Sequence, residues 1–272
     1  MNLFQSVLLG ILQGLTEFLP ISSSGHLVIV PYLLGWEIPA DDAFIFDVLV
    51  QVATLFAVFA YFWNDLRSIL QALLANTFKG KPFSDPLARL GWYLILASIP
   101  AGLIGLAVKE LVERAFDSPL ASALFLLVTA GLLLGAEKVG KRNRSLELIS
   151  AKDALWIGFF QALAIFPGIS RSGSTIVGGM MRHLDRPSAA RFSFLMSIPI
   201  MLAAGSLAAV DLIGLPEISQ KLPIYLPGFI AAAATGYLAI RWLLSYLIRH
   251  PLYLFSIYCT ALALLTLVVY LM

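Results

Sequence analysis

Three ionisable side chains in this sequence have the chemistry of an acid, a base and an anion-binding cation. Glu17 and His26 lie in the stretch GILQGLTEFLPISSSGH, which covers Gly10–His26, and Arg171 lies in GFFQALAIFPGISRSGS, which covers Gly158–Ser174. Both stretches are otherwise largely apolar. An ionisable group inside a membrane segment is costly and by default marks a functional site. We therefore expect Glu17, His26 and Arg171 to act together.

The two stretches are copies of one motif. Aligned without a gap, they share Gly10/Gly158, Gln13/Gln161, Leu15/Leu163, Phe18/Phe166, Ile21/Ile169, Ser22/Ser170, Ser24/Ser172 and Gly25/Gly173. Glu17 and His26 have no acidic or basic counterpart in the second copy. Arg171 stands where the first copy has Ser23. The duplication thus has an acid/base half and a cationic half, which predicts a single composite site.

The polar residues around these groups suit phosphate. Serines at the start of a half-helix cap it, and its free N–H groups and positive dipole end attract anions. Arg171 can bind phosphate oxygens through two parallel hydrogen bonds. Two half-helix ends would then form one phosphate cradle. The expected substrate-binding residues are Gln13, Ser22, Ser24, Gly25, Gly168, Ser170, Ser172, Gly173 and Thr175.

Composition places this site in a membrane. The chain of 272 residues is 60% hydrophobic and only 12% charged, and several charge-free windows are long enough to cross a bilayer as helices. A net charge of +2 is too small to indicate nucleic acid binding. The lone Cys259 excludes an internal disulfide and a cysteine metal cluster. The fold class predicted is an all-α polytopic membrane protein in contact with membrane lipids.

Hydropathy and loop charge define the expected topology. Basic residues concentrate in the loops 64–89, 138–152, 182–191 and 241–250, which the positive-inside rule makes cytoplasmic. The loops 37–47, 109–117 and 211–221 then lie outside. Asp47 and Gln51 are interpreted as the polar interfacial end of the first span. The six predicted spans are Phe44–Trp63, Gly91–Val108, Leu120–Gly135, Phe192–Val210, Tyr225–Leu244 and Leu252–Leu271.

Each copy of the motif is expected to be a re-entrant pair of half-helices. The second copy lies between two cytoplasmic loops and contains Pro167 and Gly168, where a helix would break. Pro20 would break the first copy, which enters from outside. The alternative lets Leu3–Leu19 and Ile21–Leu34 span separately, although both are short for that.

Three spans separate the copies, so the chain is predicted to be an inverted repeat with its site near the midplane. The first repeat covers 1–137, a basic cytoplasmic linker covers 138–152 and the second repeat covers 153–272. All of it forms one integral membrane domain. A monomer and a homodimer both remain open.

QGLTEFLPISSSGH at Gln13–His26 and PGISRSGST at Pro167–Thr175 resemble the two signature motifs of the bacterial undecaprenyl-diphosphate phosphatases, the bacitracin-resistance family. The resemblance implies a hydrolase that converts undecaprenyl diphosphate to the monophosphate and so recycles the lipid carrier of cell-wall synthesis. It also implies a location in the bacterial inner membrane, a site facing the periplasm and a divalent cation such as Mg²⁺. This chain has Gln13 where some members have Glu, which weakens any mechanism that needs a carboxylate pair.

The resemblance makes Glu17, His26, Arg171 and a serine of the Ser22–Ser24 run essential. His26 or Ser23 would attack the terminal phosphorus, or His26 would activate water. We favour His26 as nucleophile or general acid/base, with Glu17 orienting it or helping to hold a metal. A transporter or flippase for a polyprenyl lipid or small anion is the competing hypothesis, because inverted repeats with broken helices are typical of transporters. A structural scaffold would leave the buried ionisable groups unexplained.

Overall fold

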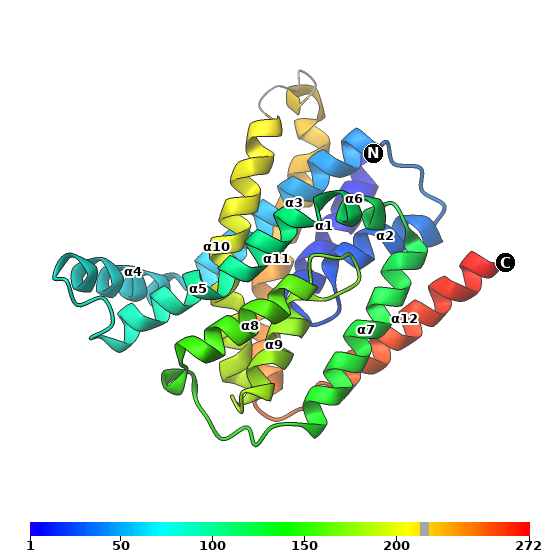
Figure 1. Cartoon of the computed structure of the whole chain (residues 1–272). Coiled ribbons are helices and arrows are strands. Elements are labelled where there is room, and N and C mark those ends of the chain that lie inside the picture. Colours follow the sequence, from blue (N-terminus) through cyan, green and yellow to red (C-terminus); the bar gives the residue numbers. More distant parts are fainter. Residues whose placement is uncertain (213–217) are drawn as a thin grey trace.

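A computed structural model describes residues 1–212 and 218–272, and this part of the chain is helical without β-strands (Figure 1). The predicted all-α class is confirmed. The helices are α1 (Leu3–Phe18), α2 (Ser23–Leu33), α3 (Ala40–Tyr61), α4 (Trp63–Phe78), α5 (Pro86–Ala107), α6 (Lys109–Phe116), α7 (Pro119–Lys138), the 3₁₀ turn η1 (Leu146–Leu148), α8 (Ala151–Leu163), α9 (Arg171–Met181), α10 (Arg186–Leu212), α11 (Ile218–Leu247) and α12 (Tyr253–Leu271).

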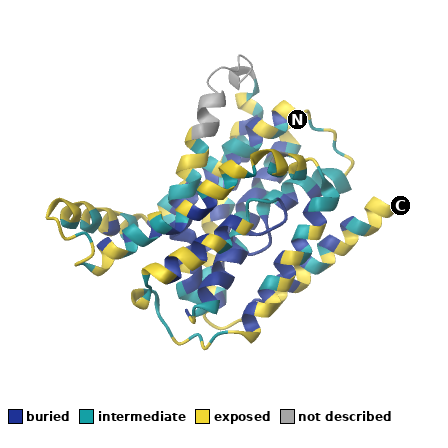
Figure 2. Ribbon diagram, viewed as in Figure 1, coloured by how far each residue is buried: buried dark blue, intermediate teal, exposed yellow. Residues whose placement is uncertain are grey.

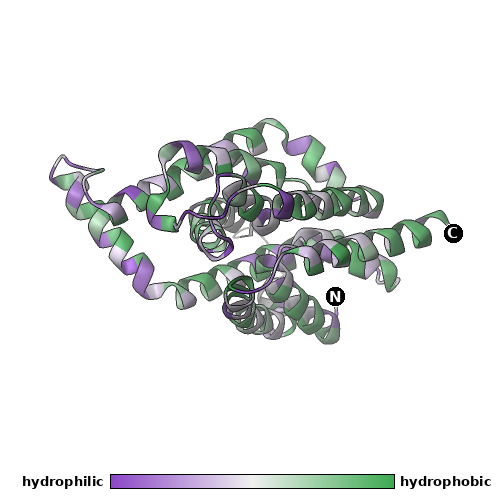
Figure 3. Ribbon diagram, turned by 90° about the horizontal axis from the view of Figure 1, so that it is seen from below, coloured by the Kyte–Doolittle hydropathy of each residue, from purple (hydrophilic) through white to green (hydrophobic). Residues whose placement is uncertain are grey.

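Six of the described helices, α3, α5, α7, α10, α11 and α12, are long and apolar enough to cross a membrane. Each overlaps one of the six predicted segments over most of its length, and seen from below they are predominantly apolar (Figure 3). The protein is therefore a multi-pass membrane protein. Several helices begin before the predicted segment, because hydropathy marks only the apolar part of a helix. The predicted outer loop over 211–221 includes residues 213–217, which lie outside the described residues.

The motif copies form two pairs of short helices, α1–α2 and α8–α9. Helix α1 ends at Phe18 and α2 begins at Ser23, so Pro20 lies in the break as predicted. Pro167 and Gly168 lie in the break between α8 and α9. Helices α2 and α9 have 11 residues each. At 1.5 Å per residue such a helix is about 16 Å long, roughly half of a hydrocarbon core. Entry and exit on the same side stay a prediction.

Both pairs begin with the same capping device. The Asn2 side chain caps α1 by accepting from the Gln5 amide, and Gln5 accepts from the Asn2 amide in return, both at 2.9 Å. The Ser150 hydroxyl accepts from the Asp153 amide at 3.3 Å, and the Asp153 carboxylate accepts from the Ser150 amide at 3.0 Å. Such reciprocal caps satisfy amides that a helix start leaves unpaired. The repeat therefore extends upstream of the aligned motif.

The two halves interlock through glycines shared by both copies. Helix α1 packs along α11 of the second half, and α8 packs along α5 of the first. A Cβ at Gly10 would lie 2.2 Å from the Gly228 carbonyl oxygen of α11, and one at Gly158 would lie 2.5 Å from the Ala97 carbonyl oxygen of α5. The absence of a side chain lets the backbones touch, as in other membrane helix pairs. Each short helix pair is thus held by the opposite half.

Asp153 anchors the linker to the second half. Its buried carboxylate accepts from Arg144 of the linker at 2.8 Å and from Arg182 after α9 at 2.6 Å. Burial opposes ionisation of Asp153, but the hydrogen bonds from Arg144, Arg182 and Ser150 outweigh it and hold the pKa of the carboxyl below its ordinary value. The linker, α8 and the end of α9 are therefore joined by one charge cluster.

Helices α4 and α6 were not predicted from hydropathy. Helix α4 lies largely exposed at one edge, whereas the breaks between α1 and α2 and between α8 and α9 lie buried at the centre (Figure 2). Helix α6 is short and carries charged residues on one side and Phe116 on another. Neither helix has an apolar run that a hydropathy scan detects. The buried centre is where the polar motif residues gather.

Candidate active site

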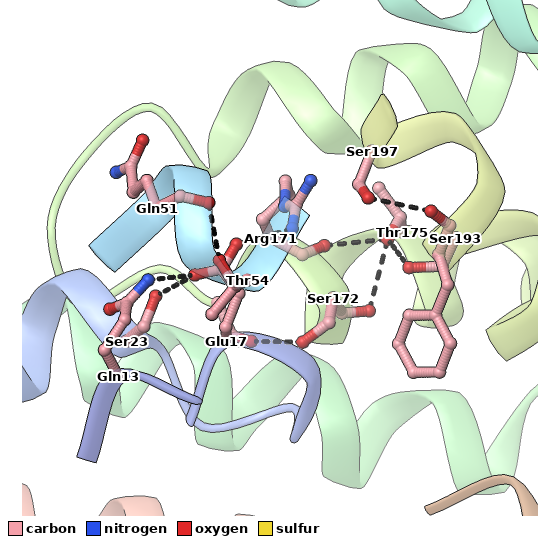
Figure 4. A network of polar contacts seen from close by, with 12 residues as sticks. Gln13, Glu17, Ser23, Gln51, Thr54, Arg171, Ser172, Thr175, Ser193 and Ser197 are labelled. Atoms are coloured by element: carbon pink, nitrogen blue, oxygen red, sulfur yellow. Dashed lines mark hydrogen bonds and ion pairs between the residues drawn. The ribbon is translucent and has the colours of Figure 1, made fainter. Parts of the chain in front are cut away.

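Glu17 is the hub of a polar network at the centre of the molecule (Figure 4). It lies in the last turn of α1, four residues after Gln13, whose amide donates to Glu17 Oε2 at 3.0 Å. Ser23, the first residue of α2, donates its hydroxyl to the same oxygen at 2.5 Å. The break at Pro20 turns the chain back so that α2 starts beside the end of α1. Glu17 and Ser23 are thus in direct contact.

Arg171 completes this network from the other copy. It is the first residue of α9, and its Nη2 donates to Glu17 Oε1 at 2.6 Å. The Nη1 of Arg171 is buried and has no hydrogen-bond partner within the described part of the chain. A buried guanidinium N–H without a partner is costly. It is therefore a donor available to an anion.

The two half-helix starts are capped alike and touch each other. The Ser22 hydroxyl accepts from the Gly25 amide at 3.3 Å, and Ser170 accepts from Gly173 at 3.0 Å. Ser22 also accepts from the Gly168 amide of the other copy at 3.1 Å. A Cβ at Gly25 would lie 2.9 Å from the Gly168 Cα, so these glycines permit the close approach. Gly168 itself has a φ of 97°, which favours glycine.

Neighbouring residues hold the second loop in place. The Thr129 hydroxyl of α7 donates to the Gly168 carbonyl at 2.8 Å and accepts from the Ser170 amide at 2.9 Å. Ser172 donates to the Leu19 carbonyl of the first loop at 2.9 Å. The Thr175 hydroxyl donates to the Arg171 carbonyl at 2.7 Å. These contacts fix the direction in which α9 presents Arg171.

A cavity of about 300 Å³ lies against this network. Six of the predicted residues line this one space: Glu17, Ser22, Ser23, Ser24, Ser170 and Arg171. The other predicted residues do not line the cavity but support its walls through the contacts described above: Gln13, Gly25, Gly168, Ser172, Gly173 and Thr175. Sequence reasoning missed Gln51 of α3 and Phe116 of α6, which also line the cavity. Gln161 of α8, which repeats Gln13 in the alignment, lines the cavity although Gln13 does not.

His26 lies away from the cavity. It is 1% exposed, and neither its ring nor its neighbour Tyr258 lines the space shared by Glu17 and Arg171. Its Nδ1 lies 2.7 Å from the Ser22 carbonyl oxygen, so Nδ1 carries the proton and donates. Its Nε2 lies 2.7 Å from the Tyr258 hydroxyl, which donates to it. The expected pairing of His26 with Glu17 is therefore replaced by contacts to Ser22 and Tyr258.

The residues of the cavity do not form a metal site held by protein alone. No group of three or more His, Cys, Asp or Glu residues that could hold a metal occurs among residues 1–212 and 218–272. Glu17 is the single carboxylate among the described lining residues, and both of its oxygens already accept hydrogen bonds. A protein cage for Mg²⁺ would need more oxygen ligands than these.

The arrangement suits transfer of an anionic group. A serine hydroxyl bonded to a carboxylate is the pattern of a nucleophile with its general base. Arg171 and the starts of α2 and α9 supply positive potential beside it. The cavity therefore joins an activated oxygen to an anion-binding surface.

Comparison with known proteins agrees with this chemistry. The family model described as "Bacitracin resistance protein BacA" matches residues 6–265. A protein of Thermomicrobium roseum named "Undecaprenyl-diphosphatase" is 42% identical over 99% of this chain and 98% of its own. Proteins of the same name from Chlorobaculum tepidum and Methanosphaera stadtmanae are 43% and 37% identical, over 95% and 98% of this chain and 93% and 98% of their own. This chain therefore belongs to the bacitracin resistance protein BacA family.

Proposed function

We propose that this protein hydrolyses undecaprenyl diphosphate to undecaprenyl phosphate and inorganic phosphate. One observation carries the proposal: Ser23, Glu17 and Arg171 contact one another beside a cavity, with a buried N–H of Arg171 left unpaired. Relatives named undecaprenyl-diphosphatase across nearly the whole chain support the substrate. The product would return to cell-wall synthesis as a lipid carrier.

In the first step, Ser23 attacks the terminal phosphorus. Its oxygen forms the new P–O bond, its proton passes to Glu17 Oε2, and the bond from phosphorus to the bridging oxygen breaks. Undecaprenyl phosphate leaves with the bonding electron pair. Arg171 Nη1 binds the oxygens of the phosphoryl group in transfer, where charge is spread in the transition state. Positioning and electrostatics therefore supply most of the catalysis.

In the second step, water attacks the phosphoserine. Glu17 first gives the proton that it took from Ser23 to the departing undecaprenyl phosphate. It then accepts a proton from the attacking water, and the bond between phosphorus and the Ser23 oxygen breaks. Inorganic phosphate leaves and Ser23 recovers its proton. Ser170, which also lines the cavity, offers a hydroxyl donor to the phosphate during both steps.

We also propose that Mg²⁺ enters with the substrate rather than residing in the protein. Mg²⁺ commonly binds through few carboxylates together with substrate phosphates. When bound in this way it would neutralise charge on the diphosphate. The donor set around Glu17 suits this arrangement better than a permanent site.

The cavity is proposed to face the periplasm from the bacterial inner membrane. The basic linker and Arg186, the first residue of α10, mark the cytoplasmic end by the positive-inside rule. Ile200 and Ala204 line the cavity from α10, and both lie nearer the end of that helix that is opposite to Arg186. Phe116 of α6 lines it as well. This placement brings the reacting groups nearer the outer surface.

Phosphate release from undecaprenyl diphosphate by purified protein tests the proposal. Ser23→Ala should lower kcat by about 10³-fold or more, because it removes the nucleophile. Arg171→Ala should lower it by about 10²–10³-fold, by analogy with loss of an oxyanion donor. Ser24→Ala is the matched control: Ser24 lines the same cavity but bonds to Ser22 rather than Glu17, so activity should stay within about tenfold.

Two outcomes would overturn the proposal. If folded wild-type protein released no phosphate, the enzyme hypothesis would be wrong, and the transporter or flippase hypothesis would be favoured. Equal activity of Ser23→Ala and Ser24→Ala would remove Ser23 as the nucleophile. A wild-type reaction repeated with chelator would measure the dependence on a divalent cation.

A further inference from the structure

We propose that the polyprenyl tail of the substrate leaves the catalytic cavity sideways, between α3 and α10, along an apolar groove that passes Met201. This inference rests on the proposed function and adds a binding surface for the hydrocarbon. It also names the side of the protein from which the lipid enters.

The groove is a cavity of about 320 Å³ between two membrane-spanning helices. Val52, Leu55 and Phe56 line it from α3, and Met201, Leu202 and Gly205 line it from α10. Met201 also lines the catalytic cavity, so the two spaces adjoin at this side chain. The groove therefore lies next to the site of phosphate chemistry, with the Met201 side chain between the two spaces.

The chemistry of the groove matches a hydrocarbon. Seven of its eight lining residues are apolar or glycine, the exception being Ser206. Phe56 is 58% exposed and Leu202 is 46% exposed, so its outer side faces the lipid around the spanning helices. A polyprenyl chain gains nothing by entering water, and its carbon atoms can remain in an apolar environment along this route. The diphosphate meanwhile reaches Arg171.

A second opening of the catalytic cavity is less suited to a hydrocarbon. A larger space of about 680 Å³ between α2, α3 and α6 shares Gln51 and Phe116 with the catalytic cavity. Most of its lining residues are apolar as well, but they include Asp47 and Asp117, whose carboxyl groups have no counterpart in the apolar groove. Apolar atoms packed against these groups would remove their hydration without replacing it. The apolar groove has no carboxyl group in its lining and is therefore the better route for the tail.

Gly205 offers a direct way to block the groove. A Cβ there would meet the Val52 side chain at 3.7 Å, an ordinary contact, so the backbone can accept a side chain. Gly205→Leu would then fill the space between α3 and α10. Gly131→Leu is the matched control, because Gly131 lines a different apolar groove of about 380 Å³ that shares no residue with the catalytic cavity.

The experiment compares kcat/KM for undecaprenyl diphosphate with kcat/KM for dimethylallyl diphosphate, whose tail is one isoprene unit. Gly205→Leu should lower the ratio of the two values at least tenfold, and Gly131→Leu should change it less than twofold. An unchanged ratio in Gly205→Leu would overturn the tail route. Wild-type protein that hydrolyses neither compound would instead overturn the proposed function, so the two failures are distinguishable.

A photoreactive polyprenyl diphosphate with its diazirine near the first isoprene units gives an independent measurement. Mass spectrometry should find the label on α3 and α10 peptides around Phe56 and Leu202. Labelling concentrated around Tyr32 and Trp36, which line the larger opening, would overturn the proposal even if the variants fold poorly.

Discussion

At the scale of single residues, His26 contacts the serine loop although it does not line the cavity. Ser22 has a φ of 70°, a left-handed conformation that costs energy in a residue other than glycine. The Nδ1 of His26 holds the carbonyl of Ser22, and Tyr258 holds the opposite ring nitrogen. Ser22 precedes the proposed nucleophile Ser23. His26 is therefore a positioning residue for the serine loop.

This role predicts partial rescue by a side chain that keeps the donor. His26→Asn retains an N–H group able to reach toward the Ser22 carbonyl, whereas His26→Ala retains none. We expect His26→Asn to be at least tenfold more active than His26→Ala, with the pH profile of kcat unchanged in shape. Phosphate release between pH 5 and 9 measures both.

Tyr258→Phe keeps the ring stacked on His26 and removes only the hydroxyl donor, so it serves as the control with a smaller loss. If His26 acted as the nucleophile or general base, the asparagine and alanine variants would be equally inactive. That result would show that His26 takes part in the reaction itself and is not only a positioning residue.

At the scale of helices, the close contacts of α1 with α11 at Gly10 and of α8 with α5 at Gly158 determine whether the two short helix pairs meet. Gly10 and Gly158 occupy matching positions in the copies, and each places its helix against backbone of the opposite half. The sequence alignment identifies these glycines as shared but does not reveal their partners. Their contacts fix how far α1 and α8 approach the centre, and hence the distance between Glu17 and Arg171.

Gly158→Ala should therefore be destabilising. Its Cβ would meet the Ala97 carbonyl oxygen at 2.5 Å, so α8 must move from α5. We expect a loss of about 1–3 kcal/mol, as for other overpacked sites. Thermal unfolding in detergent, followed by size-exclusion fluorescence, measures the shift in Tm. Gly102→Ala is the control, because its Cβ would meet nothing within 4 Å and its Tm should not fall. Equal shifts in both variants would refute the packing argument.

At the scale of the whole molecule, charge clusters join segments that the sequence separates widely. Asp153 connects the linker to the end of α9 through Arg144 and Arg182. The pKa of Asp153 is lower in the folded protein than the ordinary value of about 3.9. The ionised carboxylate thus stabilises the folded state, fully above about pH 5 and progressively less as the pH falls through 4 toward the folded pKa.

Asp153→Asn should accordingly lower the stability at pH 7 by about 2 kcal/mol, because two charged hydrogen bonds lose their ionic acceptor. Below pH 4 the difference between wild type and Asp153→Asn should shrink, because the Asp153 carboxyl of the unfolded wild-type chain then binds a proton, which favours unfolding. Tm values at pH 7, 5, 4 and 3 check this. A difference that stays constant across this range would contradict the assigned role of the ionised carboxylate.

Much of the fold was predictable from the sequence because hydropathy and helix breaks are local properties. The six spans and the breaks at Pro20 and Pro167 follow from composition along the chain. The contact of His26 with Tyr258 joins residues from distant segments, and no local pattern encodes it. Duplication did predict that Glu17 and Arg171 meet, since it pointed to two halves of one site. It could not reveal Phe116, whose helix is too short and polar for a hydropathy scan.

The interlocking of the halves has a consequence for how the ribosome delivers this protein. Glu17 is made early, but Arg171 follows 154 residues later, and the α11 surface that receives α1 comes later still. Until Arg171 has been made, the α1–α2 pair is in the membrane with a Glu17 carboxylate that lacks its cationic partner. The pair of Glu17 and Arg171 therefore forms only after the second copy of the motif has been made.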